Sequence, residues 1–587
     1  MRNGNSAWPP ERIRLLRGSA SRAEFAERVG VSPLTVYRWE LPDGSPEARR
    51  PRGQIARRLE AMFPSSDAPA PPARSSEPSD DELRELLPIL ELLLHGELGR
   101  VERELFALLA SGRLRSIGGR ALAAQGLARY QLWSRGDALG AFATLMPVLQ
   151  QAADGALAPS VELEVHVTAA LLFASFDGRV FDPGKVNAHV ARAEPLLAAG
   201  SDVQRFLLWN VQLLSAYLLG DPALIEHVLA RRDQVNRELP WVITRHATSE
   251  AAVIQAYFAR QPQQAIEEFQ QLLELSETHR LWLFHVRALG QAARNGADEG
   301  RPPDEVLALV ERAGATCKEA GLAVGVHALF LGYAEAEALY RRGRFAACEQ
   351  ALHTTLRAAD ELRWTPGILP FQLVRILLLT GRASEVRAQV DRVLAMRADI
   401  YGRIMRALQD AAAAIADLVE GLEPAAAVER VCEAVERLEQ EENSWTFLRR
   451  GMALLNVTTA LCAGDHGQIA RAFRLAERTI DATPAAHAVA MLTGLRGVRL
   501  LKEGRHVAAR GPLQRSCDAL EAAGDAVSAA IARRLLALIA HDLGEPDADA
   551  EVERTAAALA NLGVVSPTAL ERRPAPVEDR EPTDARL

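Results

Sequence analysis

Apolar residues over positions 335–360 recur at the spacing of two short amphipathic helices joined by a turn at Gly343. The apolar face of the second helix continues at i, i+4 and i+8 in Cys348, Leu352 and Leu356. A single pair of such helices cannot bury its apolar face, so it needs stacked neighbours. The pattern therefore predicts a helical hairpin that is one unit of a larger array.

The same turn recurs through most of the chain at intervals of 38 to 43 residues. Because each unit of such an array needs only its neighbours, repetition explains how a chain of 587 residues stays folded. We predict an all-α fold, with an α-solenoid of helical hairpins over residues 81–563. The predicted turns lie at Gly96, Gly136, Gly178, Gly220, Arg260, Gly300, Gly343, Gly381, Gly421, Gly464, Gly504 and Gly544.

These hairpins resemble the tetratricopeptide family. The resemblance rests on the glycine turn, a small or β-branched residue five positions later, as in Cys348, and an aromatic residue that ends the first helix, as in Tyr340-x-x-Gly343. The spacing exceeds the family's usual repeat of about 34 residues. It looks more like the longer repeats of MalT-type and peptide-pheromone regulators.

The resemblance implies that the first helix of each pair lines a concave face, with ligand-facing positions about 13, 10 and 6 residues before each turn. Side chains of this kind would suit an extended peptide with an acidic group or a free carboxylate. The alternative is a solvated inner face without a ligand. The positions are Asn210, Arg287, Arg294, Tyr333, Glu337, Phe371 and Arg375. Arg287 and Arg294 depend on Gly300 being the turn, because a turn at Gly296 would make these positions apolar.

The recurring tryptophans and the cysteines are expected to be core residues rather than parts of a ligand or metal site. Tryptophans recur near the start of the predicted first helices and are expected to pack on the preceding repeat rather than to stack a ligand; they are Trp241, Trp282, Trp364 and Trp445. The five cysteines are widely spaced within helical patterns, so we expect reduced core residues and no metal site.

The first 63 residues show a separate helical pattern. Residues 10–17 form a first predicted helix, and Ser21 with Glu24 makes a capping box that opens the next. Gly30 ends this helix, and Ser32 with the following proline can begin another over residues 33–40. Two short helices around a glycine turn predict a helix-turn-helix, closed by apolar residues Ile55, Leu59 and Phe63.

This segment is similar to the Cro/Xre class of DNA-binding domains in the run from Glu24-Phe25-Ala26 through Val29-Gly30-Val31-Ser32 to Val36 and Trp39-Glu40. The resemblance implies that residues 32–40 enter the major groove, with Val36 and Trp39 facing inward. It assigns Arg38 to a guanine, Thr35 to a thymine methyl group, and Ser32 or Tyr37 to phosphate.

Arginines around this helix would complete the predicted DNA surface. Arg22 stands where the class commonly has a glutamine that helps to fix a phosphate, so it would bind phosphate as a charge instead. Arg49, Arg50 and Arg52 form a basic loop suited to the DNA backbone.

The distribution of charge supports a polyanionic partner for this N-terminal domain. Residues 1–63 contain 12 Arg and 7 Asp or Glu, a net charge of +5, whereas the whole chain carries −8. DNA contacts should therefore be confined to residues 1–63. The alternative is a solvated basic face that binds protein. Residues 64–80 are predicted to be a flexible linker rich in Pro, Ser and Ala, and residues 564–587 a disordered tail.

Motifs of catalysis are missing from the sequence. It has no phosphate-binding loop, no His-Glu-x-x-His and no Gly-x-Ser-x-Gly, and its histidines are scattered. We predict that the protein is not an enzyme and needs neither a cofactor nor a metal. The absence of an apolar secretory signal or of a run long enough to span a membrane predicts a cytoplasmic protein.

These patterns together predict a transcriptional regulator that binds double-stranded DNA through residues 1–63 and a peptide or protein on the concave face of the array. A homodimer on a palindromic operator is expected. The alternative function is a protein-interaction scaffold whose N-terminal domain does not act on DNA.

Overall fold

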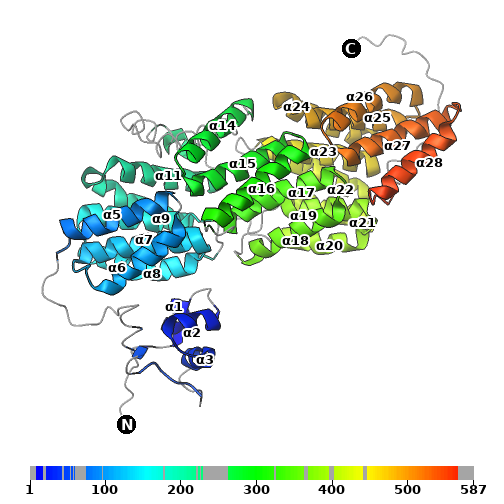
Figure 1. Ribbon diagram of the computed structural model, residues 1–587. Coiled ribbons are helices and arrows are strands. Elements are labelled where there is room, and N and C mark those ends of the chain that lie inside the picture. Colours follow the sequence, from blue (N-terminus) through cyan, green and yellow to red (C-terminus); the bar gives the residue numbers. More distant parts are fainter. Residues whose placement is uncertain are drawn as a thin grey trace.

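The structure is a computed structural model in which the described part of the chain is all helical (Figure 1). The described residues are 8, 10–17, 21–41, 45, 47–52, 55–56, 59, 75–95, 97–175, 179–219, 223–224, 226–228, 230, 262–320, 322, 325–361, 368–395, 402–440 and 446–565. Within them, a small N-terminal domain lies beside one end of a long array of helical hairpins. The predicted fold class, an α-solenoid, is confirmed.

The N-terminal domain contains α1 (Pro10–Arg17), α2 (Arg22–Val29) and α3 (Pro33–Glu40). Ser21 and Glu24 form the predicted capping box, and Gly30 ends α2 in the left-handed conformation with φ 74°. The buried core of the domain is built from all three helices and the segment after them; it contains Trp8, Ile13, Phe25, Ala26, Val29, Val36, Trp39 and Leu59. Phe63, predicted to close this core, lies outside the described residues.

The array consists of antiparallel helices that pack mainly on their neighbours in sequence. Its first half contains α5 (Asp80–His95), α6 (Leu98–Ser111), α7 (Ile117–Arg135), α8 (Ala138–Ala153), α9 (Pro159–Phe173), α10 (Pro183–Ala193), α11 (Asp202–Leu219), α14 (Pro262–Thr278), α15 (Trp282–Asp298) and α16 (Pro303–Ala320). Its second half contains α17 (Gly325–Arg341), α18 (Phe345–Glu361), α19 (Ile368–Leu379), α20 (Val386–Leu394), α21 (Gly402–Glu420), α22 (Pro424–Gln440), α23 (Thr446–Ala463), α24 (His466–Ala482), α25 (Ala486–Lys502), α26 (His506–Ala522), α27 (Ala526–Asp542) and α28 (Ala548–Asn561).

Glycines form the turns of most described hairpins, as the repeat pattern predicts. Left-handed backbone, which glycine adopts without steric cost, occurs at Gly136, Gly300, Gly343, Gly381, Gly421, Gly504 and Gly544. Gly464 is different, because it is not left-handed and a Cβ there would lie 2.8 Å from the carbonyl oxygen of Ala460. The turns predicted at Gly96, Gly178, Gly220 and Arg260 lie outside the described residues.

The position five residues after the turn is buried where the two helices of a pair approach each other. Val101, Ala141, Cys348, Val386 and Ala509 are at most 1% exposed, whereas Ile469 is half-buried and Ala426 is exposed. Small or β-branched side chains at this position allow the close packing that a hairpin needs. Four of the five cysteines are buried as expected, whereas Cys462 is exposed, which corrects its assignment to the core.

The array also makes contacts between helices that are distant in sequence. Helix α5 packs near α15, and α17 packs against α27. One core cluster joins Tyr333, Tyr340 and Phe345 of α17–α18 to Val527 of α27 and Leu559 of α28. The chain just after α28 reaches the turn before α18, where a Cβ on Gly343 would lie 2.5 Å from a methyl group of Leu562. The C-terminal helices therefore cover part of the middle of the array.

Parts of the segments predicted to be a linker and a tail are bound to the array. Residues 75–79 are bound to the array, since the carbonyls of Ser75 and Ser76 accept hydrogen bonds from the backbone N–H groups of Ile117 (3.1 Å) and Ala158 (3.4 Å). At the other end Val564 is buried and the N–H of Val565 donates to Leu379 (2.8 Å). Residues 64–74 and 566–587 lie outside the described residues.

None of the helices in the described ranges is long and apolar enough to cross a membrane.

Candidate functional site

Helix α3 is fixed by caps at both ends and by two buried side chains. The Ser32 hydroxyl accepts a hydrogen bond from the N–H of Thr35 (3.2 Å), and Pro33 begins the helix. Val36 and Trp39 are buried, as the resemblance predicted. At the carboxyl end, the Arg50 guanidinium donates to the carbonyls of Trp39 (3.1 Å) and Leu41 (2.9 Å). The helix is therefore held in one orientation on the domain.

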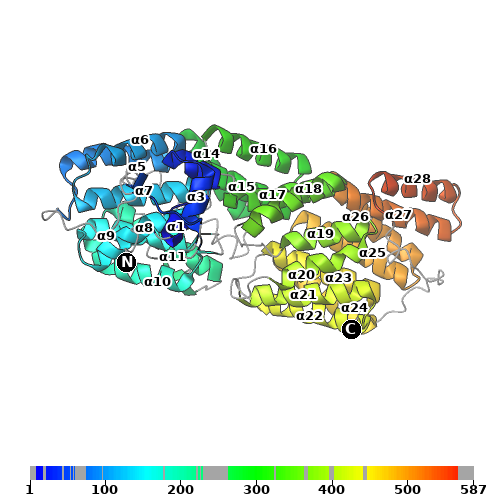
Figure 2. The same cartoon turned by 90° about the horizontal axis from the view of Figure 1, so that it is seen from below.

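The outer face of α3 is exposed over two turns. Leu34 is 53% and Tyr37 38% exposed, and Arg38 is exposed beside them while Thr35 is half-buried. The Thr35 hydroxyl lies 2.8 Å from that of Ser32, so both hydroxyls belong to the helix cap. Helix α1 lies against α8 of the array, and α3 is on the side of the domain away from it (Figures 1 and 2).

Three arginines converge on Glu40 at the end of α3. The carboxylate pairs with Nε of Arg17 (2.5 Å) and Nε of Arg22 (2.7 Å), and the Glu40 carbonyl accepts from Arg14 (2.7 Å). Burial alone would raise the pKa of Glu40, but hydrogen bonds from Arg17 and Arg22 outweigh it, so the pKa is lowered. The guanidinium of Arg22 also lies 5.2 Å from the centre of the Tyr37 ring. These contacts link α1, α2 and α3.

Two of the arginines predicted to contact phosphate thus have internal partners. Arg22 is held by Glu40 and Tyr37 while 48% of its side chain stays exposed, and Arg50 caps α3, so both stabilise the domain. Arg49 and Arg52 are exposed in the loop. Among the arginines predicted to contact DNA, Arg22, Arg38, Arg49 and Arg52 are exposed and Arg50 is half-buried.

The residues predicted to line a concave groove are divided between helices and mostly internal. Asn210 on α11 and Arg287 on α15 are half-buried. Phe371 on α19 is also half-buried, and it packs against apolar clusters that contain residues of α20, α21 and α23.

Arg294 and Tyr333 belong to a buried polar cluster around Asp298. The Tyr333 hydroxyl donates to the Asp298 carboxylate at 2.7 Å, and Nε of Arg294 lies 3.8 Å from the other oxygen. Burial raises the pKa of Asp298 from 3.8 to about 7, although Arg294 and Tyr333 oppose the shift. The same burial raises the pKa of the Tyr333 hydroxyl well above its ordinary value.

Glu337 and Arg375 form a second polar cluster on α17 and α19. Their side chains make an ion pair at 2.6 Å, and the Gln372 amide donates to the same carboxylate at 3.1 Å. The Arg375 guanidinium lies 3.4 Å from the centre of the Tyr340 ring. Together with the cluster around Asp298, this arrangement ties α15, α17 and α19 to one another. Four of the residues predicted to face a ligand, Arg294, Tyr333, Glu337 and Arg375, thus belong to these two clusters.

The repeat pattern did not identify Asp298, Glu299, Arg341 and Arg450, whose hydrogen bonds and ion pairs connect different helices of this region. The Arg450 guanidinium pairs with Glu299 at 2.5 Å, although 151 positions separate them. These four residues share no periodicity in the sequence. Their burial becomes visible only in the folded structure.

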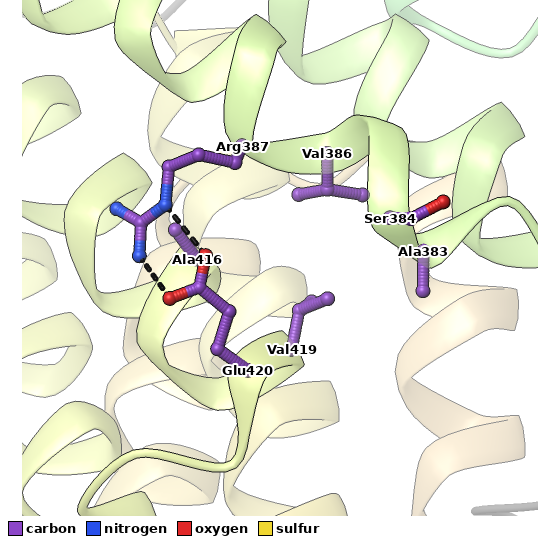
Figure 3. A pocket seen from close by; sticks show the side chains of 7 residues that line it. All are labelled: Ala383, Ser384, Val386, Arg387, Ala416, Val419 and Glu420. Atoms are coloured by element: carbon purple, nitrogen blue, oxygen red, sulfur yellow. Dashed lines mark hydrogen bonds and ion pairs between the residues drawn. The ribbon is translucent and has the colours of Figure 1, made fainter.

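Cavities along the array are small. One of about 130 Å³ lies between α20 and α21 and is lined by Val386, Ala416, Val419 and the ion pair of Arg387 with Glu420 (Figure 3). Another of about 150 Å³ lies between Glu439, Arg449 and Thr479. Pockets for small ligands usually measure roughly 300–1,000 Å³. Neither of these two is large enough, and the described residues contain no group of side chains that could hold a metal ion.

Comparisons with known proteins give a limited result. No protein-family model matches the chain. No curated protein matches it either. A solved structure entitled "Crystal Structure of Rap Protein Complexed with Competence and Sporulation Factor" is similar over 69% of this chain and 100% of that one, with 12% sequence identity and a TM-score of 0.37. A similarity with so low a TM-score carries no functional argument, so the helical-repeat architecture rests on the helices of this chain themselves.

Proposed function

We propose that this protein is a transcriptional regulator that binds double-stranded DNA through α3 and a peptide or protein partner through the array. The observation that carries the proposal is the exposed outer face of α3, with Arg38, on a helix whose other face is anchored by Val36 and Trp39. A rigid helix with an exposed basic residue is the usual reader of the major groove. The net charge of +5 on residues 1–63 would attract DNA to this domain.

In the proposed complex, Arg38 contacts a guanine edge and Thr35 offers its methyl group to a thymine. Arg49 and Arg52 lie on the exposed loop and would contact phosphates. The hydroxyl of Ser32 is already used in the cap of α3, so its contribution is to hold the helix rather than to bind phosphate directly.

The proposed role of the array is to bind a partner and to position two N-terminal domains in a cytoplasmic homodimer. Support comes from the architecture, because stacked hairpins present extended surfaces to which peptides and proteins bind. Partner binding would change the curvature of the array and so the spacing of the two domains on a palindromic operator.

The test is fluorescence anisotropy of the whole protein on its own upstream DNA, with scrambled DNA as competitor, at two salt concentrations. We expect sequence-specific binding that weakens at higher salt, and Arg38→Ala should weaken it by about 1–3 kcal/mol. Arg554→Ala is the matched control, because Arg554 is 72% exposed on α28, at the other end of the chain. It should bind as the natural protein does.

Equal binding of natural and scrambled DNA, or an Arg38→Ala variant indistinguishable from Arg554→Ala, would contradict the proposal. The result would favour the second candidate, a scaffold whose N-terminal domain binds protein. The contacts of Arg22 and Arg50 within the domain are the observation that keeps this candidate open, since both side chains already have an ion-pair or hydrogen-bond partner.

A further inference from the structure

Helix α8 differs from the other described α-helices because none of its 16 residues is charged. Every other α-helix in the described ranges contains at least one Asp, Glu, Lys or Arg. The inner face of α8 packs into the core through Ala138, Ala141, Leu145, Val148 and Ala152. A helix at the surface of a soluble protein normally carries charged residues on the face turned to water. The outer face of α8 therefore has the composition of a contact surface.

Apolar side chains lie on this outer face at helical spacing. Leu139, Ala143 and Met146 follow one another at i, i+4 and i+7, so they share one side of α8, which we call its outer face. Leu139 is 38% and Met146 45% exposed. Phe106 on α6 stands at the equivalent place in the preceding repeat and is 43% exposed. A group of exposed apolar residues of this kind marks an interaction surface.

The N-terminal domain is the part of the molecule that lies against α8. Its helix α1 packs on α8, although the two helices are far apart in the sequence. Figure 1 shows α1 between α8 and the rest of the domain, with α3 on the far side. Within the domain, Ile13 of α1 is buried in the core together with Phe25 and Trp39. A different face of α1 is therefore available for α8.

The chain that connects this domain to the array is short. The carbonyls of Ser75 and Ser76 are bound to the N–H groups of Ile117, which begins α7, and of Ala158, which precedes α9, so the chain reaches the array beside the two helices that flank α8. The 15 residues 60–74 precede this anchor and can span at most about 50 Å. A short tether keeps two groups at roughly millimolar effective concentration, so that even a weak contact with α8 is occupied.

The position of the domain on α8 also keeps DNA away from the acidic array. Residues 1–63 carry a net charge of +5 and the whole chain −8, which leaves −13 on the rest of the chain. Helix α3, with Tyr37 and Arg38 exposed, lies on the side of the domain away from α8 (Figures 1 and 2). Because a negatively charged array repels DNA, this orientation favours contact with DNA through α3.

We propose that the outer face of α8 is the docking surface of the N-terminal domain, and that this contact makes the domain turn with the array rather than independently on its tether. The inference rests on the proposed regulator function and names how the array acts on α3. A change in the curvature of the array can alter the spacing of two N-terminal domains only if each domain is fixed to its own array. The contact of α1 with α8 supplies that connection.

The first test measures the motion of the N-terminal domain in the full chain, without DNA or partner. In the ¹⁵N-labelled natural protein, the amide NMR signals of residues 10–41 should be as broad as those of α25–α28, because domain and array tumble as one particle of 63.8 kDa. The double variant Leu139→Arg/Met146→Arg places two positive charges opposite a domain of net charge +5. It should narrow the signals of the domain at least twofold. Both side chains are exposed, so the inner packing of α8 is kept.

Val507→Arg is the matched control, because Val507 is an apolar residue that is 61% exposed on α26. It should leave the signals of the domain as broad as in the natural protein. Narrow signals of the domain in the natural protein itself would overturn the proposal without any variant. Unchanged broad signals in the double variant, with its fold verified by circular dichroism, would overturn it as well.

The second test asks whether docking orients α3 on DNA. On upstream DNA that the natural protein binds, Leu139→Arg/Met146→Arg should bind at least tenfold more weakly, because two domains on free tethers lose the fixed spacing that a palindromic operator matches. Added positive charge would by itself strengthen DNA binding, so a weaker affinity reports the lost orientation. Equal affinity would overturn the role of docking in DNA binding. Because the NMR test uses no DNA, failure of docking is distinguishable from failure of the proposed regulator function.

Discussion

Single ionisable residues in the middle of the array lie where water does not reach. The Asp298 side chain is 1% exposed. The groups that face it are Arg294 from its own helix, Glu299 directly after that helix, Tyr333 from α17 and Arg450 from α23. Burial raises its pKa from 3.8 to about 7 despite the two arginines. Asp298 therefore changes its charge in the folded protein near neutral pH, whereas in an unfolded chain it does so near pH 4.

Replacing this residue should make its effect on stability visible. Between about pH 4 and pH 7 the folded protein holds a proton on Asp298 that the unfolded chain has lost, so the contribution of this residue to stability falls as the pH rises through that range. Asp298→Asn keeps a neutral side chain at every pH. We expect the natural protein and the variant to have similar melting temperatures at pH 5, and the variant to be the more stable at pH 8.

The measurement is thermal unfolding of both proteins from pH 5 to pH 8, read as the difference between them so that other titrating groups cancel. A difference that does not change with pH would contradict the raised pKa. Asp481→Asn on α24 is a suitable control, because Asp481 is exposed to water and its replacement should give no comparable trend.

Sequence patterns identified the face of α3 correctly but not the use of each arginine around it. Val36 and Trp39 were recognisable as inward because helical periodicity fixes which residues share a face. The partners of Arg22 and Arg50 within the domain were not recognisable. A long side chain at an outward position can turn back to a carboxylate or to the carbonyls at the end of a helix. Glu40 was in the motif, but its three arginine partners come from α1 and α2, and their approach depends on tertiary packing.

Pairs of helices in the array approach closely because small residues stand at their contacts. A Cβ on Gly332 of α17 would be 1.8 Å from the hydroxyl oxygen of Thr355 on α18. A Cβ on Gly314, within α16, would have no other atom within 4 Å. Two glycines inside helices thus have different reasons to be there, and only the first is required by packing.

Exchange of both glycines for alanine should separate packing from helix propensity. Gly332→Ala forces α17 and α18 apart and should destabilise the protein by about 1–3 kcal/mol, as overpacking does. Gly314→Ala relieves a helix-interior glycine and should stabilise it by up to about 1 kcal/mol. Denaturant unfolding followed by circular dichroism tests both. If Gly332→Ala were as stable as Gly314→Ala, the close approach of α17 and α18 would be wrong.

Local sequence rules were sufficient for most elements of this fold. The period of apolar residues predicted the helices, and the glycine turns predicted where each pair reverses, because both depend on residues a few positions apart. Phe371 shows where the rule stops. Its position before Gly381 assigned it to a concave face, but the spacing did not show that its half-buried ring also packs against apolar residues of α20, α21 and α23.

At the scale of the whole molecule, contacts between segments more than a hundred positions apart hold the array in a closed form. A repeat pattern describes each hairpin and its neighbours, so it contains no information about which distant hairpins meet. The pairing of Arg450 with Glu299 and the bonds of Arg341 to Ala523 are of this kind.

The pair of Glu299 and Arg450 allows this closure to be tested by a double-mutant cycle. Arg450→Met leaves the Glu299 carboxylate, 11% exposed, without its ion-pair partner, and should destabilise the protein by about 3–5 kcal/mol. Glu299→Gln/Arg450→Met removes both charges and should recover much of that loss, because no unpaired charge remains buried.

Long arrays need not unfold in a single step, so thermal unfolding should be combined with hydrogen exchange of α15 and α23. Additive effects of the two substitutions on both measurements would show that the two segments are not coupled. Recovery in the double variant would show that a contact across 151 positions stabilises the closed array.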